Sequence, residues 1–437
     1  MKILFVADDF TCDPLGIAWL SAYLKDAGHE TDAATPAEAM MLGDAPDILC
    51  YSVTTGNHVY YRTVNHMLRH RFPDAVSVFG GAHVTFFPEY IQSDNIDVGV
   101  QGEGFGAIVD IANAVESDNW FWDIDNAVID GIPNPLRPLK DKTDLLLPDR
   151  DIIYKKNFNK PIKSIMASFG CPHACPYCYN RDWKKLYKTG KTQVRPVASI
   201  VAEVEDLKRF PVKLLYFEDD VFPVYDREWL DEFCATYDRS LPFHIHLRVE
   251  YIKDETIRRL KEVGLHSVTF AIESGDDTLR RKVLKRRMTR IAILGAARTL
   301  RRHGVNFRTQ NMIGIPYETW ETALKTLFLN IECKPTMGWA SVYQPYPGTE
   351  LGDICLDNGW YEGDVDSISS SFFDTYKLGV PHGRRYERLQ KLFGLAVRHP
   401  RLGRTIVPQM AKLPFRYGWL HNKYKRRLNR ELYQLDL

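Results

Sequence analysis

Three cysteines stand close together in the segment SIMASFGCPHACPYCYNRDW, residues 164–183. Cys171, Cys175 and Cys178 have the spacing C-x3-C-x2-C and follow a β-rich stretch. Thiolates at this spacing can hold three irons of a [4Fe–4S] cluster, because cysteine sulfur is the ordinary ligand of cluster iron. The run supplies no fourth cysteine, so the fourth iron would stay open to a small chelating ligand.

A structural zinc ion is the main alternative for this run. Zinc usually takes four Cys or His ligands. The nearby candidate for the fourth ligand is His173, which is flanked by the cysteines that it would have to join. A disulfide is disfavoured because three is an odd number. Spacing and setting therefore favour the cluster. The other cysteines are scattered, and we expect most of them to be buried small hydrophobes: Cys12, Cys50, Cys234, Cys333 and Cys355.

The cysteine run, with the aromatic Tyr177 just before its third cysteine, resembles that of the radical S-adenosylmethionine (SAM) enzymes. The resemblance implies that the amino and carboxylate groups of SAM chelate the open iron. It also implies that the reduced cluster, supplied by a flavodoxin- or ferredoxin-type electron donor, splits SAM into methionine and a 5′-deoxyadenosyl radical. The three cysteines would then be catalytic residues as well as metal ligands.

Length and composition are those of an ordinary globular protein. The 437 residues are enough for two or three domains, with 45% hydrophobic and 26% charged residues. No apolar run approaches the ~18 residues of a membrane span. The first residues read as a strand, and no signal peptide is evident. We therefore expect a cytoplasmic protein, where a reduced cluster can survive.

Apolar strand-like runs alternate with helix-length patterns over residues 1–116. The alternation predicts a doubly wound, Rossmann-like parallel α/β sheet. Ligands of such sheets bind at the carboxyl ends of the strands, and glycines there let the backbone approach a ligand closely. The candidate ligand-binding residues in these loops are Ser52, Thr54, Thr55, Gly80, Gly81, His83, Gly102 and Glu103.

Several pieces of residues 1–116 resemble the cobalamin-binding domain that precedes the barrel in one radical SAM subfamily: PLGIAWLSAYLKDAGHE, SVTT, GGAHVTFFPE and GEG. The motif D-x-H-x-x-G, whose histidine binds cobalt from below in other cobalamin proteins, is absent. The resemblance therefore implies cobalamin with no histidine on cobalt, and His83 as a loop-shaping or cofactor-contact residue. A nucleotide-binding domain or an emptied scaffold is the alternative, but no G-x-G-x-x-G follows the first strand.

Residues 117–160 mix aromatics, prolines and charges, which predicts a linker or strap with a hairpin. A second α/β alternation over residues 161–350 has about six βα units, typical of a partial (β/α)6 TIM-like barrel. Polar residues at strand ends line the mouth of such barrels. Each of these residues alone could be a helix cap or a surface ion pair, but as a set at successive strand ends they favour a site. They are Glu218, Asp219, Arg248 and Glu273.

The pieces FEDDVF, IESG, NMIGIP and YPGT resemble the barrel of the same subfamily. The resemblance implies that these strand-end residues, with Tyr177, bind SAM. Glu218 and Asp219 would contact its amino group, Glu273 its ribose and Arg248 its carboxylate end. The basic run at 280–290 is predicted to be a solvated face, with a phosphate-bearing ligand as the alternative.

Residues 351–437 are predicted to be mainly helical and basic. The stretch 384–437 carries 14 Lys+Arg and 3 Asp+Glu, a net charge of +11, whereas the preceding chain carries −10. A helical cap on the active site is the favoured interpretation. Peripheral contact with a membrane surface is second, and no motif supports binding to nucleic acid.

The resemblance as a whole implies a cobalamin-dependent radical SAM methyltransferase. It would transfer a methyl group from methylcobalamin to an unactivated carbon of a small-molecule or lipid-like substrate. A cyclase or oxidoreductase with the same cofactors is the first alternative. A non-catalytic iron–sulfur or cobalamin protein that senses or transfers electrons is an alternative of another class.

Overall fold

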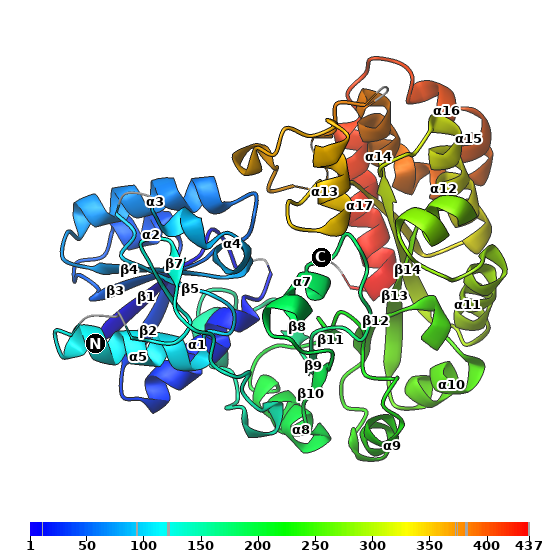
Figure 1. The fold of residues 1–437 in the computed structure, drawn as a ribbon. Helices are drawn as coiled ribbons and strands as arrows, with labels where there is room; N and C mark the ends of the chain where they lie inside the picture. The colour runs from blue at the N-terminus through cyan, green and yellow to red at the C-terminus, as the bar shows by residue number, and fades with distance from the viewer. Residues whose placement is uncertain are drawn as a thin grey trace. The chain divides into compact units, whose positions relative to one another are not determined.

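The computed structural model describes all residues except 11, 93–94, 120–122, 372, 374, 381–382 and 436–437. The chain forms two compact units (Figure 1). The first consists of residues 1–160, 186–188 and 202–211, and the second of residues 161–185, 189–201 and 212–437. Each unit is considered by itself below.

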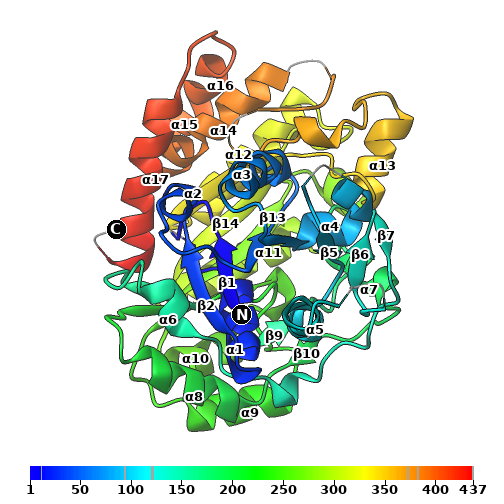
Figure 2. The same cartoon turned by 90° about the vertical axis from the view of Figure 1, so that its left-hand side faces the viewer.

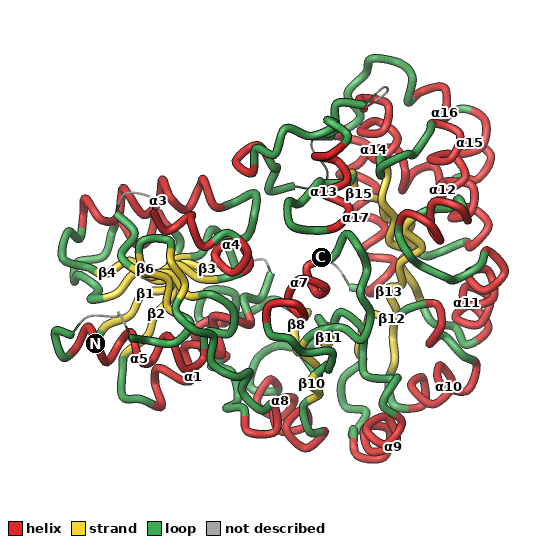
Figure 3. The backbone as a smooth tube through the Cα atoms, viewed as in Figure 1, coloured by secondary structure: helices red, strands yellow, loops and turns green. Residues whose placement is uncertain are grey.

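The first unit is built on one seven-stranded sheet with the order β2-β1-β3-β4-β5-β6-β7. The first five strands are parallel, and the last two are antiparallel. Helix α3 lies on one face, and helices α1 and α5 lie on the other (Figure 3). The elements are β1 Lys2–Val6, α1 Leu15–Asp26, β2 Glu30–Ala34, α2 Pro36–Met40, β3 Ile48–Ser52, α3 His58–Arg71, β4 Val76–Gly80, α4 Ala82–Phe86, η1 Pro88–Gln92, β5 Val98–Val100, α5 Phe105–Glu116, β6 Ala127–Ile129, β7 Ile132–Pro133, η2 Lys142–Asp144 and α6 Arg150–Tyr154. The doubly wound fold is therefore confirmed.

Burial on both faces of this sheet explains why the sequences of its strands are continuous apolar runs. In β1, Leu4 and Val6 on one face and Ile3 and Phe5 on the other are all at most 3% exposed. A parallel sheet covered by helices on both faces buries both sets of side chains, so neither set needs to be polar.

Residues 117–160, predicted to be a linker, are part of the first unit. The hairpin β6–β7 is present and extends the sheet beyond β5. Helix α6 contributes Arg150, whose guanidinium pairs with Glu203 in full burial. Tyr154 donates to the carboxylate of Asp13 (2.8 Å). This segment is thus held by buried polar contacts as well as by strand pairing.

The second unit contains a six-stranded, fully parallel sheet with the order β15-β14-β13-β12-β11-β8. Helices α9 to α12 lie along its outer side (Figures 1 and 3). The elements are β8 Ile162–Ile165, β9 Ser168–Phe169, α7 Tyr179–Leu186, β10 Gln193–Val194, α8 Val197–Leu207, β11 Leu214–Phe217, α9 Arg227–Thr236, β12 Phe243–Leu247, η3 Val249–Tyr251, α10 Asp254–Glu262, β13 Leu265–Glu273, η4 Leu279–Val283 (a π-helix), α11 Arg290–Arg302, β14 Asn306–Ile313, α12 Trp320–Cys333 and β15 Met337–Val342. The last residue of α7 and residues 202–207 of α8 belong to the first unit. This is the predicted partial (β/α)6 barrel.

The chain after β15 is mainly helical, as predicted. Helices α14 to α17 form one group, with α17 alongside α14 (Figure 2). The elements are α13 Glu350–Asp357, η5 Val365–Ser367, α14 Gly383–Arg398, α15 Pro400–Thr405, α16 Val407–Met410 and α17 Gly418–Tyr433. Within the part of the chain that the structure describes, none of the helices combines the length and apolar character that crossing a membrane requires.

Candidate active site

The three cysteines lie on the loop between β9 and α7 of the second unit. Gly170 has φ +84° and turns the chain directly before Cys171. The backbone N–H of Cys178 donates to the carbonyl of Cys175 (3.1 Å), so the last two cysteines share one tight turn. All three are free thiols of intermediate exposure. The loop therefore presents three partly exposed thiols at the start of a helix.

Two side chains donate towards these sulfurs. Arg248 Nη1 lies 3.5 Å from Cys175 Sγ, and Asn180 Nδ2 lies 3.6 Å from Cys178 Sγ. Asn180 also donates to Asp220 (2.9 Å), which fixes the direction of its amide. Such donors stabilise negative charge on sulfur and tune the potential of a cluster.

Burial near the loop shifts the pKa values of a cysteine thiol and of His173 in opposite directions. Burial raises the pKa of the Cys178 thiol to about 12, so iron has to displace a proton from this sulfur. Burial, with Arg248 next in size, lowers the pKa of His173 to about 4, and its Nε2 lies 3.2 Å from the Tyr251 hydroxyl. Among the described residues, no three His, Cys, Asp or Glu side chains converge as a single-ion site. A cluster does not need such convergence, because each sulfur binds a different iron.

Glu273 ends β13 in a backbone conformation that non-glycine residues rarely adopt. Its φ is +65°, and the pairing of β13 with β14 shifts register between Ala271 and Glu273. The Tyr177 hydroxyl donates to Glu273 Oε1 (3.1 Å), and Arg286 Nη1 lies 3.1 Å from that hydroxyl and 3.6 Å from the carboxylate. Burial raises the pKa of Glu273 against the opposing effect of Arg286. Strain of this kind persists only where neighbouring groups hold it, and it is typical of functional sites.

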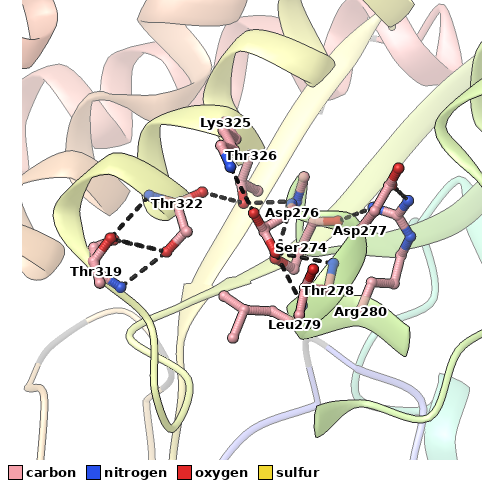
Figure 4. Close-up of polar contacts among 11 residues, drawn as sticks. Ser274, Asp276, Asp277, Thr278, Leu279, Arg280, Thr319, Thr322, Lys325 and Thr326 are labelled. Carbon is pink, nitrogen blue, oxygen red and sulfur yellow. Dashed lines mark hydrogen bonds and ion pairs between the residues drawn. The ribbon is translucent and has the colours of Figure 1, made fainter. Parts of the chain in front are cut away.

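The turn after Glu273 is fixed by a second set of contacts (Figure 4). Asp276 accepts from the backbone N–H groups of Thr278 and Leu279 (both 3.0 Å) and from Lys325 Nζ (2.7 Å). Gly275 packs so closely on α12 that a Cβ there would lie 2.3 Å from the Lys325 carbonyl oxygen. The turn that follows Glu273 therefore packs tightly against α12 and is bonded to it through Lys325.

The two acidic residues after β11 differ in their surroundings. Glu218 is exposed, and the Ser164 hydroxyl lies 2.9 Å from its Oε1. Asp219 is fully buried, and accepts from the Ala167 N–H (3.0 Å) and the Ser168 hydroxyl. Burial raises the pKa of Asp219 to about 7, although these hydrogen bonds lower it. Glu218 is thus exposed at the end of the strand, whereas Asp219 holds the segment that leads to Cys171.

In the first unit, the predicted ligand loops follow the adjacent strands β3, β4 and β5. Ser52 and Thr54 are exposed, and Thr55 is half-buried, with its hydroxyl 3.1 Å from His83 Nδ1. His83 is 2% exposed and stacks on His58 at 3.9 Å between ring centroids. Gly81 has φ +95°, and a Cβ there would lie 2.6 Å from the Val53 carbonyl oxygen.

The loop after β5, which contains Gly102 and Glu103, is held by contacts within the first unit. The Glu103 carboxylate pairs with buried Lys142 and accepts from the backbone N–H of Lys140 (2.6 Å). The backbone N–H of Glu103 donates to the Tyr187 hydroxyl (2.8 Å), and a Cβ on Gly102 would collide with that same hydroxyl. Glu103 therefore shapes its loop, whereas the hydroxyls after β3 remain open.

Comparison with known proteins decides the family. Residues 1–112 match the model of the B12 binding domain, and residues 165–329 match that of the radical SAM superfamily. The chain is a radical SAM protein with a B12-binding domain.

Relatives of this radical SAM protein include the anaerobic magnesium-protoporphyrin IX monomethyl ester cyclase of Rubrivivax gelatinosus, 25% identical over 80% of this chain and 69% of the relative. The methyltransferase TsrM from Kitasatospora setae has a similar fold, with a TM-score of 0.68 at 18% identity over 82% of this chain and 76% of TsrM. The cobalamin-dependent enzyme OxsB has a TM-score of 0.69 at 14% identity, over 99% of this chain and 72% of OxsB.

The residues of this radical SAM protein fit the cofactors that the family implies, namely a [4Fe–4S] cluster, SAM and cobalamin. The loop at 171–178 offers three free thiols, enough for three of the four irons of a cluster. The strand-end carboxylates and Arg248 suit the charged groups of SAM. The open hydroxyls at Ser52 and Thr54 lie at a carboxyl edge where doubly wound sheets bind ligands. It is thus a cobalamin-dependent radical SAM enzyme.

Sequence reasoning missed four residues of this site: Ser164, Ser168, Asn180 and Arg286. Arg286 lies in the basic run at 280–290 that was predicted to be a solvated face, but Arg280 and Arg286 are 1% and 4% exposed. Arg280 donates to the carbonyls of Ser274 (2.6 Å) and Met288 (2.9 Å), and Arg286 donates to that of Ala271 (2.9 Å). The prediction for these two side chains is wrong, because a run of like charges carries no signal for which members turn inward.

Proposed function

We propose that this enzyme is a methyltransferase that places a methyl group on an unactivated carbon. The observation that carries the proposal is the pairing of a B12-binding unit and a radical SAM barrel in one chain. When bound, the cluster and SAM supply a radical that removes a hydrogen atom, and cobalamin supplies the methyl group. The protein's own residues bind and orient these groups and exclude water.

The assignment of residues to SAM follows from charge and access. Cys171, Cys175 and Cys178 are the proposed cluster ligands. Glu218 and Glu273 are proposed to accept hydrogen bonds from the ammonium and ribose groups. Arg248 is proposed to reach the carboxylate end, since it already lies 3.5 Å from Cys175 Sγ.

Tyr177 and Asp219 are proposed to act through their neighbours. Tyr177 holds the Glu273 carboxylate, and Asp219 holds the segment at 167–168. In the B12-binding unit, Ser52, Thr54 and Thr55 are the proposed hydroxyl contacts. The proposed backbone contacts and loop-shaping residues there are Gly80, Gly81, His83, Gly102 and Glu103.

A cyclase is the second candidate, and one observation favours it. The relative in Rubrivivax gelatinosus is named as a cyclase and matches 80% of this chain. A cyclase would join two parts of its substrate and lose hydrogen, whereas a methyltransferase would add one carbon. Product mass separates these reactions.

The experiment that tests the proposal is anaerobic reconstitution with iron, sulfide and hydroxocobalamin, followed by reduction and SAM labelled with deuterium in its methyl group. A methyltransferase forms both 5′-deoxyadenosine and S-adenosylhomocysteine, and a product that carries the labelled methyl group. Formation of 5′-deoxyadenosine with an unlabelled, dehydrogenated product would support the cyclase instead.

A further inference from the structure

A half-buried arginine lies on the inner face of the barrel sheet, away from the cysteine loop. Arg308 is the third residue of β14, and it pairs with Thr269 of β13 and Met337 of β15. Its Nε donates to Thr269 Oγ1 (3.1 Å), and its Nη2 donates to the Tyr216 hydroxyl (2.9 Å). The guanidinium carbon lies 5.7 Å from the centroid of the Trp339 ring.

All of these partners of Arg308 are uncharged. Among the described residues, no carboxylate forms an ion pair with this guanidinium, and its Nη1 makes no hydrogen bond. The charge of Glu218 raises the pKa of Arg308. Burial lowers the pKa values of nearby His244 and His246, which are therefore neutral. A partly desolvated cation without a counter-ion is costly, and a bound anion would offset that cost.

The inner face between Arg308 and the SAM residues is accessible. Along β14, the inward-facing Arg308, Gln310 and Met312 are half-buried, whereas the residues that alternate with them are fully buried. The same holds for Trp339 and Ser341 on β15. Asn311 pairs with Glu273, so Arg308 lies three residues, or about 10 Å, further into the barrel than Glu273.

We propose that Arg308 binds an acid group of the substrate, a carboxylate or a phosphate, while the remainder of the substrate extends along the inner face towards Glu273. Nη1 is the open donor, and the indole of Trp339 offers an apolar wall beside it. The inference rests on the proposed function only in placing the reacting carbon near Glu273. The substrate would then be an acid whose reacting carbon lies about 10 Å from its charged end.

The test is a calorimetric binding comparison on the reconstituted full chain, with decanoate, decyl phosphate and the neutral decanamide as probes. We expect at least one anion to bind roughly tenfold more tightly than decanamide, since a charge-assisted hydrogen bond contributes about that much. Arg308→Gln should lose this preference and keep its affinity for decanamide. The tighter of the two anions identifies carboxylate or phosphate as the head group.

The matched control is Arg302→Gln, because Arg302 is an exposed arginine at the end of α11 and should leave binding unchanged. Arg308→Lys keeps the charge, and should retain part of the preference if Arg308→Gln does not fold. The proposal is overturned if no anion binds better than decanamide, or if Arg308→Gln keeps the preference. Binding needs no SAM turnover, so failure of methyl transfer would leave this result intact.

A different observation concerns the surface of the C-terminal helices. Five of the fifteen large apolar side chains that are exposed in the described chain fall within residues 402–419. We call them the apolar tip: Leu402, Ile406, Leu413, Phe415 and Trp419. They lie on α15, just before and after α16, and in the first turn of α17, within the helical group of Figure 2. Phe415 and Trp419 are 61% and 66% exposed.

The apolar tip is surrounded by positive charge. Residues 398–430 include ten Lys+Arg and no Asp or Glu. Nine of these ten cations are exposed: Arg398, Arg401, Arg404, Lys412, Arg416, Lys423, Arg426, Arg427 and Arg430. Aromatic and aliphatic side chains beside basic ones are the pattern by which proteins lie on anionic lipid headgroups.

We infer that the apolar tip binds an anionic lipid surface. Vesicle flotation of the reconstituted full chain tests this, with phosphatidylcholine vesicles against vesicles that also contain phosphatidylglycerol. Binding should require the anionic lipid and weaken as salt is added. The double substitution F415S/W419S should reduce binding about tenfold or more, because it removes two large apolar groups.

Ile291→Ser is the control, because Ile291 is 78% exposed on α11 of the same unit and lies outside the apolar tip. It should bind vesicles like the unmodified protein. Absence of binding, equal binding to neutral vesicles, or binding that survives F415S/W419S would each overturn the inference. So would a dimer in the absence of vesicles that F415S/W419S converts to monomer, since that would assign the tip to self-association.

Discussion

Glu273 is held by two side chains that differ in kind. Tyr177 comes from the cysteine loop, and Arg286 comes from the loop after the π-helix that follows β13. Because Glu273 has a left-handed backbone and a raised pKa, its position and charge depend on both partners. The residue that binds ribose in our proposal is therefore coupled to the loop that binds the cluster.

Arg286→Gln should weaken SAM binding and slow SAM cleavage about tenfold or more, while the iron and sulfide content stays normal. The substitution removes the positive charge that opposes the rise in the pKa of Glu273 caused by burial. SAM affinity by equilibrium binding and 5′-deoxyadenosine formation measure the effect. Arg287→Gln is the control, since Arg287 is exposed; an equal loss in that variant would contradict the assignment.

Glu318 makes the free energy of unfolding depend on pH, and one substitution can test this contribution. It accepts from the Gly314 N–H (2.5 Å), and burial raises its pKa to about 8. The folded state keeps this proton up to about pH 8, whereas the unfolded chain releases it near pH 4.5. The contribution of Glu318 to stability is therefore fully present below pH 4.5, falls between pH 4.5 and 8, and is constant above that range.

Glu318→Gln should remove this part of the pH dependence. Relative to the unmodified protein, the variant should gain stability as pH rises from 4.5 to 8, by on the order of a few kcal/mol. Denaturant unfolding of the apoprotein at several pH values measures the difference. A constant difference across that range would show that Glu318 is ionised in the folded state.

Among the elements, the junction of β13 with α12 positions the active site. Gly275 allows this close approach because it has no side chain, and Thr326 Oγ1 accepts from its backbone N–H (2.8 Å). Asp276 then caps the following turn and pairs with Lys325 on the same helix (Figure 4). One glycine thus sets the distance between a strand end and a helix.

Gly275→Ala should destabilise the protein by about 1–3 kcal/mol, because the new Cβ collides with backbone that cannot rotate away. It should also weaken SAM binding, since the neighbouring Glu273 moves with the turn. Chemical denaturation and SAM binding measure the two effects. Gly295→Ala on α11 is the control, where a Cβ meets nothing closer than 3.9 Å and should be neutral or stabilising.

For the whole molecule, two units carry separate cofactor sets in our proposal. Cys175→Ala should lose the iron–sulfur absorbance and all SAM cleavage, while hydroxocobalamin stays bound. The cysteine belongs to the second unit, and the open hydroxyls of the cobalamin loops belong to the first. Retained SAM cleavage by this variant would overturn the cluster assignment, and simultaneous loss of cobalamin would contradict the division of roles.

Local sequence patterns alone predicted the cysteine site and the order of strands and helices in this protein. The spacing of Cys171, Cys175 and Cys178 is a property of a few adjacent residues, so it is visible without a fold. The alternation of strands and helices is also local, and it predicted both sheets, the partial barrel and the strand ends that carry Glu218, Arg248 and Glu273. Each follows from side-chain periodicity and turn residues.

Tertiary structure alone decided which polar side chains meet. Asp219 and Glu218 are adjacent in sequence, but one is buried under Ser168 and the other is open. Arg286 reaches Tyr177 across 109 positions, and Arg308 reaches Tyr216 across 92. Such pairings depend on the register and packing of distant strands, and a charged residue looks the same in sequence whether it faces water or a buried partner.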